Sequence, residues 1–229
     1  MKNNHNSTTD PMAGIYGDFP DHLTEKEVRK LRSIFTEFVA GFKIMMDKGP
    51  FVSVFGSSKT NPADPKYDMG RKLGQELVRN GFAVLTGGGP GLMEAANRGA
   101  HDANGRSMGI NISIPDEQTT NPYTDPSITI NHFFVRKVLL LKYSTAYVFL
   151  PGGYGTLDEL FETVTLMQTK KIKRFPMVLM NSEHWAGLLD WIKTRLKKDG
   201  FIDVNDMDYL TVVDSVDEAV SVIKNARQK

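Results

Sequence analysis

The chain has 229 residues, of which 40% are hydrophobic and 24% charged, so it is long enough for a sizeable core and unlike a disordered or fibrous protein. Lysine and arginine (28) nearly balance aspartate and glutamate (27), and the net charge of +1 gives no reason to expect binding to nucleic acid or to a membrane surface. The absence of cysteine excludes disulfides, thiolate catalysis and cysteine-ligated metals, and it fits a reducing, cytoplasmic location.

The first residues of the chain are polar and rich in turn formers, and they lack the apolar core of a secretory signal. We therefore expect a mobile tail over residues 1–22, followed by a single domain over residues 23–229. No apolar run approaches the ~20 residues of a membrane-spanning helix. Thr24 and Glu27 have the spacing of a capping box, which predicts the start of a helix whose apolar residues continue at helical spacing to Met45.

Short apolar runs alternate with helical patterns along the rest of the chain. The runs predict strands at 51–55, 82–86, 107–112, 127–131, 146–150, 176–180 and 210–213. Helices are expected at 67–80, from 91 to about 100, and at 133–143, 156–168 and 185–197, with a last helix capped by Ser215 and Glu218. This alternation predicts an α/β fold with a doubly wound, mostly parallel sheet, which is Rossmann-like and has three α/β/α layers.

Three glycine-containing loops follow predicted strands, at the edge where open parallel sheets bind ligands. They are Gly56-Ser57-Ser58, Gly87 to Gly91, and Gly152 to Thr156. Glycines let the backbone approach an anion, and the N–H groups of the following helix favour phosphate. The two glycine-rich loops match neither the dinucleotide fingerprint nor the P-loop. We expect a phosphorylated ligand, against the alternative that the glycines serve only the strand-to-helix turns.

The third loop continues into polar residues that a turn does not require. Thr156 and Glu159 follow its glycines, and a bound anion would use the threonine hydroxyl and bring the glutamate close to the ligand. The alternative is that the two residues form a capping box, with Thr156 as the N-cap. One pair of residues can serve both purposes.

Arg136 and Lys137 stand in the first turn of a predicted helix, where cations oppose the helix dipole. A broken local preference of this kind indicates a functional site. The alternative is a solvated edge or pairing with a nearby carboxylate. The five histidines show no metal-ligand spacing, so we expect no metal site.

The segments GGGPGLMEAANRGA (Gly87 to Ala100) and PGGYGTLDE (Pro151 to Glu159) resemble the Lonely Guy family of cytokinin riboside 5′-monophosphate phosphoribohydrolases. Many members carry an older description as possible lysine decarboxylases. The family pattern P-G-G-x-G-T-x-x-E is met at every fixed position, and the R-K pair that precedes it is met by Arg136-Lys137. The likeness extends from about Phe51 to Gln168.

The resemblance implies hydrolysis of the N-glycosidic bond of a nucleoside 5′-monophosphate to free base and ribose 5-phosphate, without metal or organic cofactor. It also implies a homodimer or higher homo-oligomer with sites at the subunit interface. Arg136 and Glu159 match the catalytic pair, and the role of Arg136 stays open among orienting Glu159, binding sugar hydroxyls and neutralising the departing base. The matched phosphate- and nucleotide-binding positions are Gly152, Gly153, Gly155, Thr156, Lys137 and Thr165. The glycine-containing loops add Tyr154, Gly87, Gly88, Gly89 and Ser57 as candidate binding residues.

The loop Pro115 to Tyr123 resembles a bacterial branch of the family and adds Glu117 as a further ligand residue. The base stays open between adenine, in AMP, and an isopentenylated cytokinin base. Two other functions remain as alternatives. One is a non-catalytic carrier of a phosphorylated ligand, similar to the molybdenum-cofactor carriers, which would not need Arg136 and Glu159. The other is decarboxylation with pyridoxal phosphate, which would need a lysine Schiff base.

Overall fold

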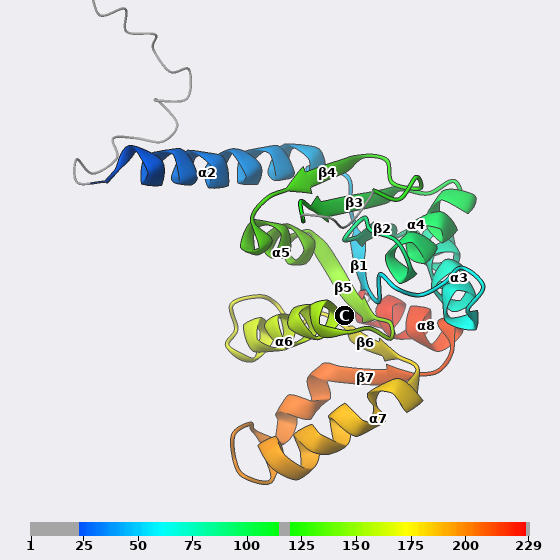
Figure 1. Ribbon diagram of the computed structural model, residues 1–229. Coiled ribbons are helices and arrows are strands. Elements are labelled where there is room, and N and C mark those ends of the chain that lie inside the picture. The colour runs from blue at the N-terminus through cyan, green and yellow to red at the C-terminus, as the bar shows by residue number, and fades with distance from the viewer. Residues whose placement is uncertain (1–22, 115–119, 228–229) are drawn as a thin grey trace, which may run out of the picture.

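The computed structural model describes residues 23–114 and 120–227 (Figure 1). Its centre is one seven-stranded sheet in the order β4-β3-β2-β1-β5-β6-β7, and every neighbouring pair is parallel. The strands are β1 (Phe51–Phe55), β2 (Ala83–Thr86), β3 (Ser107–Ile112), β4 (Ser127–Ile130), β5 (Ser144–Phe149), β6 (Met177–Met180) and β7 (Leu210–Val213). This confirms the predicted doubly wound parallel sheet.

Helices cover both faces of the sheet (Figure 1). One apolar core lies under α3 (Pro65–Arg79), α4 (Leu92–Asp102) and α8 (Val216–Arg227). The other lies under α2 (Glu25–Met45), α5 (Phe133–Lys142), α6 (Tyr154–Gln168) and α7 (Ser182–Trp191). The apolar runs predicted the central strands because side chains on both faces of a covered parallel sheet are buried. None of the helices within the described ranges is long and apolar enough to cross a bilayer.

Capping residues set several helix ends as predicted. The Thr24 backbone N–H donates to Glu27 Oε2 (2.8 Å), and the Glu27 N–H donates to Thr24 Oγ1 (3.3 Å), so the expected capping box begins α2. Ser215 and Glu218 make the same pair of hydrogen bonds at the start of α8 (3.1 and 3.2 Å). These bonds satisfy backbone donors that a helix end otherwise leaves without acceptors.

The start of α6 differs from the prediction. The helix begins at Tyr154, with Gly153 as an N-cap that has no side-chain hydrogen bond. Thr156 therefore lies inside the first turn, and its N–H donates to the Gly153 carbonyl (3.0 Å). The capping interpretation of Thr156 and Glu159 is wrong for this reason, because neither side chain caps the helix.

Other helix and strand boundaries also differ from the predicted ones. The helix expected at 185–197 begins at Ser182, because Asn181 accepts from the His184 N–H (2.9 Å), and its last part is a π-helical turn, η1 (Ile192–Lys197). A 3-10 helix, η2 (Val204–Tyr209), was not predicted; Asp203 caps it. Strand β5 starts at Ser144 rather than 146, because Ser144 pairs with Phe51 of β1, and its buried hydroxyl also hydrogen-bonds with Ser53 Oγ (2.7 Å).

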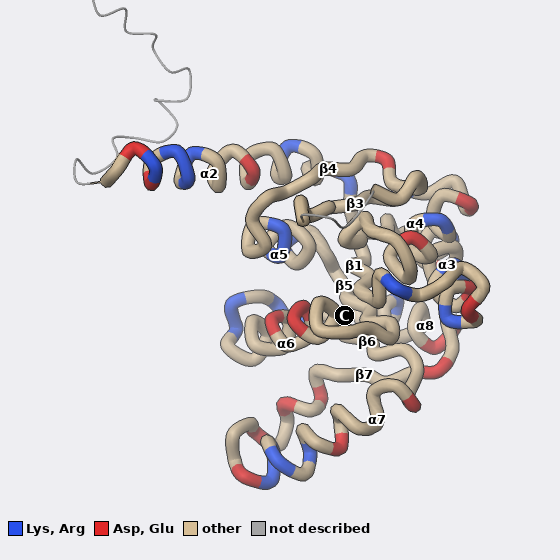
Figure 2. The backbone as a smooth tube through the Cα atoms, viewed as in Figure 1, with Lys and Arg blue, Asp and Glu red and all other residues tan. Residues whose placement is uncertain are grey.

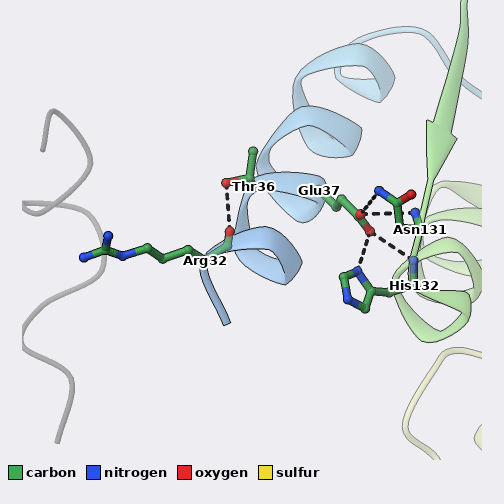
Figure 3. A network of polar contacts seen from close by, with 5 residues as sticks. All are labelled: Arg32, Thr36, Glu37, Asn131 and His132. Atoms are coloured by element: carbon green, nitrogen blue, oxygen red, sulfur yellow. Dashed lines mark hydrogen bonds and ion pairs between the residues drawn. The ribbon is translucent and has the colours of Figure 1, made fainter. Parts of the chain in front are cut away.

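A buried carboxylate ties α2 to the start of α5 (Figure 3). Glu37 accepts hydrogen bonds from the backbone N–H groups of Asn131 (3.1 Å) and His132 (3.2 Å). It also accepts from Asn131 Nδ2 (2.8 Å) and His132 Nδ1 (3.0 Å). Burial opposes ionisation of Glu37, but the hydrogen bonds from His132 and Asn131 outweigh it and lower the pKa of the carboxyl. The N-terminal helix therefore helps to fix the helix that carries Arg136 and Lys137.

Candidate active site

A cleft of about 460 Å³ opens at the carboxyl edge of the sheet, where the loops after β1, β2 and β5 meet. The chain proceeds from β1 outward to β2, β3 and β4, and then returns to place β5 on the other side of β1. The cleft therefore lies at the topological switch point, the position where doubly wound sheets bind ligands. All three loops that the sequence singled out contribute to its lining.

Ser57 connects the three loops through its backbone. Its N–H donates to the Pro151 carbonyl (3.0 Å), and its carbonyl accepts from the Leu92 N–H (2.9 Å). This close approach requires Gly91, which has φ +69° and whose added Cβ would lie 2.3 Å from Ser57 O. The loops therefore form one hydrogen-bonded rim.

The N-terminus of α6 forms one wall of the cleft. Gly153, Tyr154, Gly155 and Thr156 line it, and the N–H groups of Tyr154 and Gly155 in the first turn have no intrahelical acceptor. An anion at this place would gain these donors and the favourable end of the helix dipole. Gly152 is not part of the lining. Its N–H donates to His184 Nε2 (3.2 Å), so it anchors the loop to α7.

Glu159 lies on the second turn of α6 and lines the same cleft. Its side chain is buried, with the residue only 7% exposed, and Oε2 has no hydrogen-bond partner among the described residues. Burial raises the pKa of Glu159 to about 7, although the positive charges of Lys137 and Arg136 oppose this shift. A buried carboxyl that is partly ionised near neutral pH can take up and release a proton during a reaction.

Arg136 extends from α5 across the ends of two strands into the cleft. Nε donates to the Ile110 carbonyl (2.8 Å), and Nη2 donates to the Gly87 carbonyl (3.1 Å). A Cβ added to Gly87 would lie 2.0 Å from Nη2, so this position must be glycine for the guanidinium to fit. Burial lowers the pKa of Arg136, and the negative charge of Glu159 opposes that shift. The unusual place of Arg136 in the first turn of α5 is thus explained by its reach into the site.

Lys137 is not part of the cleft lining and pairs with carboxylates of α6. Its Nζ lies 2.8 Å from Asp158 Oδ1 and 2.6 Å from Glu162 Oε2. Figure 2 shows the basic segment on α5 and the acidic segment on the facing part of α6. Burial opposes the charge of Lys137, but the hydrogen bonds that it donates to Asp158 and Glu162 raise its pKa overall. The structure therefore gives Lys137 the carboxylate-paired position that the sequence left open as an alternative.

A buried polar network holds Gly88 and Gly89. The Gly88 N–H donates to Thr86 Oγ1 (2.9 Å), which donates to Asn97 Oδ1 (2.5 Å). Asn121 Nδ2 donates to the Gly89 carbonyl and to Asn97 Oδ1 (3.0 Å each). Gly87 lines the cleft, whereas Gly88 and Gly89 are buried behind it and shape the loop.

One further predicted site residue, Thr165, lies outside the cleft lining. Thr165 is exposed on α6, and its hydroxyl donates to the Phe161 carbonyl (2.7 Å) rather than to a group in the cleft. Glu117 lies outside the described residues. The cleft also contains residues that the sequence did not single out, among them Lys59, Met93 and Phe133. The signal available for Lys59 was its place directly after Ser57-Ser58, in a loop already selected.

The donor set of the cleft does not fit a metal centre. No group of three or more histidine, cysteine, aspartate or glutamate side chains that could hold a metal ion occurs in residues 23–114 and 120–227. The cleft instead offers the buried carboxylate of Glu159, the fixed guanidinium of Arg136 and the N-terminus of α6. This arrangement can bind an anion and place an acid–base group beside it.

Known proteins share this sequence and fold. The family model described as possible lysine decarboxylase matches residues 93–223. Two Arabidopsis thaliana proteins named cytokinin riboside 5′-monophosphate phosphoribohydrolase are each 31% identical to the chain. The LOG5 protein aligns over 66% of this chain and 67% of its own length. The LOG4 protein aligns over 70% of this chain and 76% of its own.

Solved structures with the same fold include two molybdenum-cofactor proteins. The molybdenum cofactor binding protein of Rippkaea orientalis has a TM-score of 0.58 and 22% identity, covering 78% of this chain and 98% of its own. The molybdenum cofactor carrier protein of Chlamydomonas reinhardtii has a TM-score of 0.57 and 23% identity, covering 79% and 99%. These likenesses concern the fold alone.

The match to the family model over more than half of the chain, together with the Arabidopsis relatives, shows that the chain belongs to the Lonely Guy (LOG) family.

Proposed function

We propose that the protein hydrolyses the N-glycosidic bond of a nucleoside 5′-monophosphate, AMP or a cytokinin riboside 5′-monophosphate, and releases the free base and ribose 5-phosphate. One observation carries the proposal: the buried Glu159 carboxyl, with an unpartnered oxygen and a pKa raised to about 7, lines the same cleft as the open N-terminus of α6. The names of the Arabidopsis relatives support this substrate class.

The phosphate binds at the N-terminus of α6 in this proposal. The N–H groups of Tyr154 and Gly155 and the Thr156 hydroxyl supply hydrogen bonds, and the helix dipole adds favourable electrostatics. Because the phosphate does not react, its binding energy can orient the ribose so that C1′ meets Glu159.

The bond between C1′ and the base breaks through a sugar with oxocarbenium character, as in glycoside hydrolysis. The electrons of that bond pass to the base nitrogen, and water adds to C1′. The ionised Glu159 stabilises the developing positive charge and accepts the proton that the water releases. Transfer of this proton to the departing base returns the carboxylate to its starting state.

Arg136 acts as a fixed positive charge beside Glu159. Two of its N–H groups are used by the carbonyls of Gly87 and Ile110, so the guanidinium cannot move freely toward a ligand. Its charge favours the ionised form of Glu159, which is the form that accepts a proton. This supports a role of Arg136 in setting the ionisation state of Glu159, in addition to the three roles that the sequence left open.

Chromatographic assay of base release tests the function. The wild-type protein should liberate adenine from AMP or the free cytokinin from its riboside monophosphate, and Glu159→Gln and Arg136→Ala should lose this activity while keeping the wild-type circular dichroism spectrum. Activity of Glu159→Gln at the wild-type rate would exclude the mechanism. The pH profile should show kcat rising as pH increases toward about 7, because the ionised carboxyl is the active form.

The carrier function is the second candidate, favoured by the fold likeness to the molybdenum-cofactor proteins. A carrier would be stabilised by its phosphorylated ligand without turnover. The buried pair of Arg136 and Glu159 argues against it, because a non-catalytic binder gains nothing from a carboxylate whose burial opposes ionisation. Base release that depends on Glu159 separates the two functions.

We also propose that the protein is a homodimer whose interface lies over α2, α5 and α6. Large apolar side chains are exposed there: Leu31, Phe35, Phe133, Phe134, Val138 and Phe161. Phe133 also lines the cleft, so an interface at this face would adjoin the site. Light scattering should give the mass of a dimer, and Phe134→Asp with Val138→Asp should give a monomer.

The absence of cysteine supports a cytoplasmic location.

A further inference from the structure

We propose that Lys59 binds the 5′-phosphate of the substrate and is the residue that makes the enzyme prefer a nucleotide to its unphosphorylated riboside. The inference rests on the proposed function and adds to it a determinant of substrate class. It follows from the position of Lys59, from the charge distribution in the cleft and from the state of the neighbouring cations.

Lys59 stands on a constrained backbone at the rim of the cleft. Its N–H donates to Ser57 Oγ (3.1 Å), and Ser57 is in turn bonded to both glycine loops. Lys59 lines the same cleft as the N-terminus of α6. The backbone therefore presents the side chain at a defined place, and only the flexible methylene chain must order when a ligand binds.

The other cations near the site are already engaged. Arg136 donates to two backbone carbonyls, and Lys137 pairs with Asp158 and Glu162. Lys59 makes no side-chain hydrogen bond or ion pair with any of the described residues, and its side chain is exposed. It is thus the cleft-lining cation, within the described ranges, that is available to an incoming anion.

A phosphate monoester carries nearly two negative charges at neutral pH. The N–H groups of α6 supply hydrogen bonds and a partial charge, but no full positive charge. The unpartnered carboxyl oxygen of Glu159, buried in the same cleft, would repel a phosphate that came close to it. A lysine that supplies a full charge at the rim therefore fixes the phosphate away from Glu159 and leaves the sugar beside it.

The cleft lining has a polar part for the phosphate and an apolar part for the base. Ser57, Ser58 and Lys59 form its polar rim, whereas Ile112, Ile114 and Phe133 are apolar and suit a base. A riboside would keep the apolar contacts and lose only the interaction with Lys59 and the α6 N-terminus. The contribution of Lys59 should consequently appear in the comparison of a nucleotide with its riboside.

The experiment compares AMP with adenosine in the wild type, Lys59→Gln and Lys59→Arg. Lys59→Gln should raise KM for AMP about tenfold or more, because a charge-assisted hydrogen bond is lost, and change kcat less than about threefold. Its kcat/KM for adenosine should equal that of the wild type, and Lys59→Arg should restore most of the preference for AMP. The matched control is Lys66→Gln, because Lys66 pairs with Asp64 (3.6 Å) outside the cleft and should keep wild-type kinetics.

Two results would overturn the proposal: an unchanged KM for AMP in Lys59→Gln, or an equal loss for AMP and adenosine. Thermal unfolding with added ribose 5-phosphate keeps this test separate from the proposed function. A wild-type protein that is stabilised by ribose 5-phosphate and releases no base would refute the hydrolase. Loss of that stabilisation in Lys59→Gln would still support phosphate binding by Lys59, and its retention would refute it.

Discussion

Glu37 on α2 and His132 at the start of α5 share one carboxylate oxygen, Oε2, which accepts from the His132 backbone N–H (3.2 Å) and from its ring Nδ1 (3.0 Å) (Figure 3). Helix α5 carries Arg136 one turn later. A residue outside the cleft lining thus caps the helix that carries the guanidinium, because the carboxylate accepts from N–H groups that have no acceptor within the helix.

Glu37→Ala should destabilise the protein by about 2–3 kcal/mol, because it removes the four hydrogen bonds of a buried carboxylate, two of them to the partly buried backbone N–H groups of Asn131 and His132. Urea unfolding at pH 7 measures the difference. Glu25→Ala is the matched control, because Glu25 is exposed on the same helix, where it pairs with the exposed Arg29 (3.2 Å). The control should change stability by less than about 0.5 kcal/mol.

The same variant has a predicted pH dependence. The pKa of Glu37 is lowered in the folded protein, so its stabilising effect is present above the ordinary glutamate pKa and is lost as pH falls through the folded value. The difference between the wild type and Glu37→Ala should therefore shrink below about pH 4. A difference that stayed constant from pH 7 to pH 3 would contradict the role of the ionised carboxylate.

Glu159→Gln should stabilise the protein at pH 8 while removing its activity. The pKa of Glu159 is raised to about 7, so the folded state holds the proton more tightly than the unfolded chain, and the ionised carboxyl costs stability as pH rises from about 4.3 to 7. Removing that cost should increase the free energy of unfolding by roughly 1–3 kcal/mol at pH 8 and change it little at pH 4. Thermal melts at the two pH values give the comparison, and equal stabilities at pH 8 would argue against the raised pKa.

Gly87→Ala should displace Arg136, because the new methyl group would lie 2.0 Å from Nη2. We expect base release to fall at least tenfold and stability to fall by about 1–3 kcal/mol. Gly187→Ala provides the control. Gly187 lies in α7 with no atom within 4 Å of the added Cβ, so the substitution should preserve activity and slightly favour the helix.

His184→Phe should loosen the loop at the start of α6. Phenylalanine can keep the edge-to-face contact with Trp185 (4.8 Å between ring centroids), but it cannot accept from the Gly152 N–H. Hydrogen exchange over residues 151–156 should become faster, and KM for the nucleotide should rise a few-fold with little change in the overall melting temperature. His101→Phe is the control, because His101 is not part of the cleft lining, and it should leave both measurements unchanged.

The parallel sheet could be predicted because its strands are short apolar runs separated by helical patterns. The start of α6 could not, because the sequence T-x-x-E is also a capping signal, and the actual N-cap is the glycine three residues earlier in extended conformation (φ −98°, ψ −151°). Which cap forms depends on where β5 ends and on the hydrogen bond from Ser57 to Pro151, and these are tertiary contacts.

The candidate site also contains features that the sequence predicts and features that it does not. Motif spacing pointed to Arg136 and Glu159, and both line the cleft. The partners of Arg136 are the carbonyls of Gly87, directly after β2, and of Ile110 in β3, and strand order sets their proximity. Backbone acceptors leave no residue-type signal, so they could not be predicted from the sequence. The pairing of Lys137 with Glu162 likewise depends on the contact between α5 and α6.

The two hydrogen bonds of Ser57 to Pro151 and Leu92 use only main-chain atoms. Any amino acid at that position other than proline could form both of them, so a mutation there would keep the loops joined, although a side chain without an acceptor would lose the bond from the Lys59 N–H to Ser57 Oγ (3.1 Å). In the course of evolution, substitutions at this position could therefore change which anionic group of a ligand is bound. The main-chain hydrogen bonds that join the loops around the ligand would be kept.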